Sequence, residues 1–119
     1  MANALIVDDS RTSRKILRTI LETSGYTVVG EATNGQEGID KYKELKPDFV
    51  TLDITMPVKD GIEVLTEIKE FHKEAKVIMV TAAGQKVKMV EAIKIGADDF
   101  ISKPFDTDVL LETVKRIVG

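Results

Sequence analysis

Residues 4–9 read ALIVDD, four apolar residues followed at once by two aspartates, Asp8 and Asp9. The pattern recurs along the chain: residues 49–53 read FVTLD and end in Asp53, residues 77–81 read VIMVT and end in Thr81, and residues 100–104 read FISKP and contain Lys103. If these runs are parallel strands of one sheet, their carboxyl ends lie at the same edge. The sequence therefore predicts three carboxylates, a hydroxyl and an ammonium at one point, an arrangement that a stable fold does not require.

The composition is typical of a globular protein, with 43% apolar and 31% charged residues over 119 positions. This length predicts one domain over residues 1–119, and because the chain ends with its last predicted helix at Gly119, we expect no output domain. The net charge of -3, with both signs spread along the chain, argues against a nucleic-acid partner. The apolar runs are far shorter than the ~20 residues that cross a bilayer, which argues against a membrane partner. We expect a cytoplasmic protein, in keeping with the absence of cysteine.

Apolar runs alternate with helical periodicities, which predicts a parallel α/β sheet. We expect strands at residues 4–7, 27–32, 49–53, 76–80 and 99–102. The first, third and fourth are nearly continuous apolar runs, as expected for strands covered on both faces, whereas the second and fifth carry polar residues and suit the edges. With right-handed crossovers, the strand order is 2-1-3-4-5, a single doubly wound (βα)5 domain of flavodoxin-like topology. In this order a crevice opens where Asp8, Asp9 and Asp53 lie.

Two expectations concern residues outside this cluster. The helix that ends at Gly96 should present Val87, Val90 and Ile93 as its apolar face. His72, the only histidine, lies in a charged stretch and should be an exposed helix residue with no catalytic role.

The residue types in the cluster are those that phosphoryl transfer needs. Three adjacent carboxylates repel one another, and a hard divalent cation such as Mg²⁺ removes the conflict. A carboxylate can also be the nucleophile that forms an aspartyl phosphate, while Lys103 supplies positive charge and Thr81 a hydroxyl hydrogen bond. Each residue alone has an ordinary explanation, such as a helix cap, a turn residue or a surface lysine. Their joint occurrence at four strand ends favours function.

The sequence resembles the response-regulator receiver domains of bacterial two-component signalling over essentially its whole length. The motifs that carry the resemblance are LIVDDS at residues 5–10, LDITMP at 52–57, Gly61, VTA at 80–82 and KPF at 103–105. The resemblance implies that Asp53 is the phosphoacceptor and that Thr81 and Lys103 contact the phosphoryl group. It also implies direct Mg²⁺ binding by Asp9, Asp53 and the backbone carbonyl of Thr55, with Asp8 assisting through water.

The resemblance carries further implications around the phosphoryl site. The peptide bond between Lys103 and Pro104 should be cis, and Ala82 should leave room for the phosphoryl group. Thr55 and Ala83 match the positions that control the attacking water, and because neither is an acid or an amide, we expect slow self-hydrolysis and a dedicated phosphatase.

The resemblance also implies a switch. On phosphorylation Thr81 should move toward the phosphate and Phe100, which stands where many relatives have tyrosine, should turn inward. The readout face would be the fourth helix, the fifth strand and the fifth helix. The chain would be a signalling phosphoacceptor that promotes its own phosphorylation and slow dephosphorylation, and not an enzyme.

Residues 30–35 (GEATNG) and 41–48 (KYKELKPD) are particularly similar to stand-alone chemotaxis regulators of the CheY type. That similarity implies a CheA-like histidine kinase as phosphodonor, a flagellar motor switch protein as target and a monomeric chain. The close alternative is a single-domain phosphorelay intermediate of the sporulation type. A haloacid-dehalogenase-type phosphatase is a third interpretation, but that class needs an aspartate where this chain has Thr55. No G-x-G-x-x-G or Walker A motif supports a nucleotide site.

Overall fold

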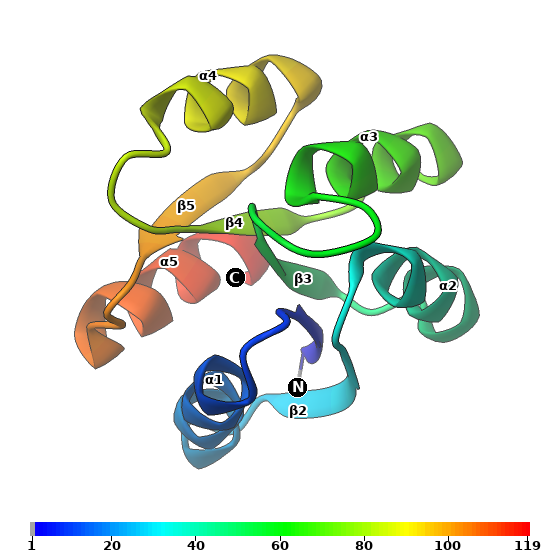
Figure 1. Cartoon of the computed structure of the whole chain (residues 1–119). Helices are drawn as coiled ribbons and strands as arrows, with labels where there is room; N and C mark the ends of the chain where they lie inside the picture. The colour runs from blue at the N-terminus through cyan, green and yellow to red at the C-terminus, as the bar shows by residue number, and fades with distance from the viewer. Residues whose placement is uncertain (1) are drawn as a thin grey trace.

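The computed structural model describes residues 2–119 as a five-stranded parallel sheet with helices on both faces (Figure 1). The strands are β1 (Asn3–Val7), β2 (Thr27–Ala32), β3 (Phe49–Asp53), β4 (Val77–Thr81) and β5 (Asp99–Ser102). The helices are α1 (Arg11–Thr23), α2 (Gly35–Leu45), α3 (Gly61–Phe71), α4 (Lys86–Ile95) and α5 (Thr107–Val118). The sheet order is β2-β1-β3-β4-β5, so the predicted topology is confirmed, and β4 lies one residue later than expected.

Two apolar cores lie on the two faces of the sheet. Helices α1 and α5 cover one face, and helices α2, α3 and α4 cover the other (Figure 1). Successive residues of β1 therefore enter opposite cores: Leu5 and Val7 belong to one, Ala4 and Ile6 to the other. This double burial explains why the central strands read as continuous apolar runs.

Most helix starts have a side-chain cap. Ser10 accepts a hydrogen bond from the Ser13 N–H at the start of α1, and Asn34, Asp60 and Asp106 cap α2, α3 and α5 in the same way. Helix α4 begins after Gln85, whose side chain makes no such cap within the described residues. The start of α4 thus differs from the other helix starts. The side chain of Gln85 instead makes hydrogen bonds with Ala82 and Thr55.

The predicted apolar face of α4 is wrong. Val87, Val90 and Ile93 are 74%, 45% and 58% exposed, and the residue that α4 buries is Ala92. The helix is apolar on two opposite sides, because Met89, Ala92 and Ile95 also recur at helical spacing and pack toward the core. Periodicity alone could not choose between the two stripes.

In residues 2–119 the structure contains no helix that combines the length and the apolar character needed to cross a bilayer.

Candidate functional site

The carboxylates gather where β1 and β3 end. These strands pair in parallel with Val7 opposite Leu52, so Asp8 and Asp53 follow at the same edge of the sheet. Asp8 is fully buried, Asp53 is nearly so and Asp9 is exposed. Each contributes an oxygen to a group whose atoms all lie within 4.8 Å of one another. The structure thus brings the three predicted aspartates together.

Lys103 completes the charge cluster from the loop after β5. Its Nζ lies 3.2 Å from Asp8 Oδ2 and 3.6 Å from Asp53 Oδ2. The backbone N–H of Lys103 donates to the Thr81 carbonyl at 2.8 Å, which anchors this loop to the end of β4, and the bond from Lys103 to Pro104 is cis. One ammonium therefore pairs with two of the three carboxylates.

The electrostatics of Asp53 reflect this imbalance. The pKa of Asp53 is raised from 3.8 to about 6, mainly by burial and next by the neighbouring Asp8. Lys103 and a hydrogen bond from the Thr55 backbone N–H act in the opposite direction. Asp8 Oδ1 accepts from the Ser10 N–H at 2.8 Å, whereas the buried Asp8 Oδ2 has only its ion pair with Lys103 and no hydrogen bond from any described residue.

The loop between β3 and α3 is built tightly against the phosphoacceptor candidate. The Gly61 N–H donates to the Ile54 carbonyl at 2.6 Å, and a Cβ at Gly61 would lie 2.3 Å from the Asp53 carbonyl oxygen. Only glycine fits such an approach. Val58, at the exposed tip of the loop, adopts φ 71°, a left-handed conformation that strains a β-branched residue.

The proposed switch residues lie on neighbouring strands. Thr81 ends β4 and is buried, and its Oγ1 donates to the Ile101 carbonyl of β5 across a long 3.5 Å. Phe100, one residue earlier on β5, is partly buried against the core under α2, α3 and α4. Ala82 and Ala83 follow Thr81 and are exposed at the mouth of the site.

Sequence reasoning missed Gln85. Its Oε1 accepts from the Ala82 N–H at 2.6 Å and its Nε2 donates to Thr55 Oγ1 at 2.6 Å. The side chain thereby joins the loop after β4 to the loop after β3. A faint signal existed, because glutamine is not among the residues favoured at a helix N-cap.

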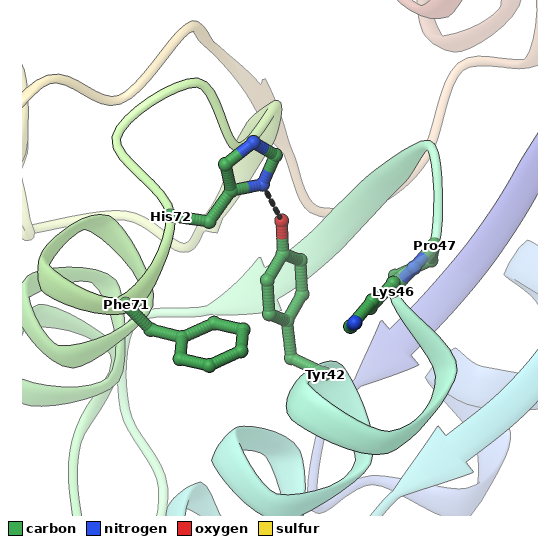
Figure 2. Close-up of a pocket in the computed structure, with 5 residues that line it drawn as sticks. All are labelled: Tyr42, Lys46, Pro47, Phe71 and His72. Carbon is green, nitrogen blue, oxygen red and sulfur yellow. Dashed lines mark hydrogen bonds between the residues drawn. The ribbon is translucent and has the colours of Figure 1, made fainter.

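A hollow of about 290 Å³ lies at the edge of the sheet opposite the carboxylate cluster, where α2 and α3 end (Figure 2). The residues that line it are Tyr42, Lys46, Pro47, Phe71 and His72. The Tyr42 hydroxyl and His72 Nδ1 are hydrogen bonded across 3.0 Å. His72 is exposed as expected, but it lies just past the end of α3 and not within the helix. The hollow contains no cluster of carboxylates among its lining residues, so it does not rival the site formed by Asp8, Asp9 and Asp53.

Residues 4–115 match the response regulator receiver domain family. The chain belongs to this family. The receiver domain is 50% identical over 119 residues to protein CcdB of Bacillus subtilis, covering 100% of this chain and 99% of that protein. It is also 50% identical to the chemotaxis protein CheY of Thermotoga maritima, covering 95% of this chain and 94% of the relative. The CheX–CheY–BeF3–Mg²⁺ complex from Borrelia burgdorferi contains a chain that is 41% identical, with a TM-score of 0.94, covering 99% of this chain and 90% of that chain.

These similarities identify a CheY-like response regulator domain, a signalling protein and not a conventional enzyme. They agree with the acidic cluster, which offers the oxygen ligands that a hard divalent cation prefers.

Proposed function

We propose that this receiver domain is a phosphorylation-activated switch in which Asp53 accepts a phosphoryl group from a histidine kinase. The observation that carries the proposal is the buried Asp53 carboxylate, which lies beside Asp8 and 3.6 Å from the Lys103 ammonium. Because the carboxylates outnumber the positive charge beside them, the site favours binding of a cation. The same cation can offset the negative charge of an incoming phosphoryl group.

The donor set fits Mg²⁺. Asp8, Asp9 and Asp53 bring carboxylate oxygens together, and the buried Asp8 Oδ2 accepts no hydrogen bond from the described residues. In the proposed site Asp9, Asp53 and the Thr55 backbone carbonyl would bind the ion directly, and Asp8 would assist through water. Mg²⁺ prefers oxygen ligands and usually keeps waters and phosphate oxygens in its shell. When bound, the ion would neutralise charge on the carboxylates and on the transferred group.

In the transfer, an Asp53 carboxylate oxygen attacks phosphorus, and the bond from phosphorus to the kinase histidine nitrogen breaks. The product is an acyl phosphate on Asp53 and a free imidazole on the donor. Lys103 stabilises the phosphoryl oxygens by charge and Thr81 by a hydroxyl hydrogen bond. The small side chain of Ala82 leaves space for the group. The chain thereby promotes its own phosphorylation, and with Thr55 and Ala83 beside the site its self-hydrolysis is slow.

The phosphoryl group then acts on the output face through Thr81. The 3.5 Å contact between Thr81 and Ile101 is long for a hydroxyl hydrogen bond and is readily exchanged for one to phosphate. Phe100 fills the space that Thr81 leaves, which changes the surface of α4, β5 and α5. The exposed Val87, Val90 and Ile93 make the α4 part of this face suitable for a protein partner.

The relatives favour chemotaxis as the pathway. Several are chemotaxis proteins, two of them 50% and 48% identical to this chain over nearly its full length. We therefore propose that the monomeric, cytoplasmic domain receives its phosphoryl group from a CheA-like kinase, binds a flagellar motor switch protein and is reset by a phosphatase. The Borrelia CheY was solved in a complex with CheX, which supports a further protein partner for this chain. A single-domain phosphorelay intermediate remains the second candidate, because the equally similar CcdB is not described as a chemotaxis protein.

The proposal is tested by incubating the protein with acetyl phosphate and Mg²⁺ and recording its intact mass. We expect one phosphoryl adduct that is absent from Asp53→Asn and absent when a chelator removes the metal. An unmodified wild-type chain, under conditions that phosphorylate a CheY standard, would contradict the assignment. Turnover of phosphate esters would instead support the phosphatase interpretation.

A further inference from the structure

Two loops border the phosphoacceptor, and a single side chain ties them together. The loop after β3 carries Thr55 and the loop after β4 carries Ala82; the two strands pair in parallel, so both loops leave the same edge of the sheet. Gln85 accepts from the Ala82 N–H through Oε1 and donates to Thr55 Oγ1 through Nε2, each across 2.6 Å.

This bridge connects directly to the reacting carboxylate. The Thr55 backbone N–H lowers the pKa of Asp53 and so acts on that carboxylate, and Gln85 joins Thr55 to Ala82. The Asp53 side chain is only 10% exposed, so a phosphodonor or an attacking water has a narrow approach. In-line attack needs that approach to be open.

We propose that Gln85 is a positioning residue that acts as a latch, holding the two loops closed over Asp53 until it releases. This inference rests on the proposed function of Asp53. Opening of the latch admits both a small phosphodonor and the water that hydrolyses the acyl phosphate. Gln85 thus contributes to the phosphoryl lifetime. Thr55 and Ala83, which match the positions that control the attacking water, carry no acid or amide group that could do so.

The test compares Gln85→Ala with Gln36→Ala, the other glutamine of the chain, which bonds to Asp40 on the surface of α2. Removing the latch loses exposed neutral hydrogen bonds, so we expect phosphorylation by acetyl phosphate and subsequent phosphoryl loss each to become about three- to tenfold faster. Gln36→Ala should match the wild type in both rates. Unchanged or slower rates in Gln85→Ala would overturn the latch.

A double-mutant cycle separates positioning from a general structural effect. Thr55→Val removes the acceptor Oγ1 and keeps the side-chain shape. If Gln85 acts through Thr55, the double variant should be no faster than Gln85→Ala alone, because both changes break the same contact. Accelerations that multiply would contradict the proposed route.

Amide hydrogen exchange gives a readout that does not depend on phosphorylation. The Ala82 N–H should exchange faster in Gln85→Ala than in the wild type, and at the wild-type rate in Gln36→Ala. If the wild-type protein takes up no phosphoryl group, the proposed function fails, and the exchange of Ala82 then decides the latch by itself. Equal exchange in all three proteins would overturn it.

Discussion

The crowding of carboxylates at the phosphoacceptor predicts that Asp53→Asn stabilises the metal-free protein. A pKa raised from 3.8 to about 6 means that ionising Asp53 is disfavoured in the folded chain. At about 1.4 kcal/mol per pH unit, the cost is about 3 kcal/mol as an upper bound. Solvent screening at the open side of the site reduces it, so we expect about 1–3 kcal/mol. Asparagine has nearly the same shape as aspartate and removes the charge.

The size of the stabilisation by Asp53→Asn depends on pH. Because the folded-state pKa of Asp53 lies above its ordinary value, the protonated group carries no penalty below about pH 4, and the penalty grows as the pH rises toward about 6. The Asp53→Asn variant should therefore unfold at higher urea than the wild type at about pH 8, and at nearly the same urea at about pH 4, with a chelator present throughout. Added Mg²⁺ should shrink or reverse the difference in unfolding free energy at about pH 8, because Mg²⁺ binds the wild type more tightly than the Asp53→Asn variant.

Urea unfolding followed by circular dichroism at both pH values measures the difference directly. A variant that is less stable than the wild type at about pH 8 without metal would refute the electrostatic reasoning. An equal stabilisation at both pH values would assign the effect to packing and not to charge.

Three further substitutions test the surroundings of the site. Gly61→Ala places a Cβ against the Asp53 carbonyl, so we expect a loss of about 1–3 kcal/mol in urea unfolding, together with slower phosphorylation as Asp53 is displaced. Val58→Gly relieves the left-handed strain and should raise the unfolding free energy by about 1 kcal/mol; a lower melting temperature would contradict this. Ala83→Gln places an amide that can orient water beside the phosphoryl group, so phosphoryl loss should accelerate, and an unchanged lifetime would count against that role.

The sheet and the site were predictable because the same residues encode both. Buried parallel strands need continuous apolar runs, and their common direction places Asp8, Asp53 and Thr81 at one edge whatever the details of the helices. The polar residues of β2 and β5 identified the edges for the same reason.

What sequence reasoning missed depends on tertiary contacts. Helix α4 has two apolar stripes, and only its position over the sheet selects Ala92 for burial and leaves Val90 outside. Gln85 contacts Thr55 thirty residues away, so a local pattern could mark Gln85 as an unusual N-cap residue but could not reveal its partner. Similarly, the end of α3 brings His72 against Tyr42 only once both helices have packed.

The most direct test of the central claim is to locate the phosphoryl group. After phosphorylation with acetyl phosphate and Mg²⁺, borohydride reduces an aspartyl phosphate to homoserine, and peptide mass spectrometry then identifies the altered residue. The account predicts homoserine at position 53 and aspartate retained at positions 8 and 9. Reduction at Asp8 or Asp9, or a phosphoryl group on a residue that borohydride leaves unchanged, would contradict it.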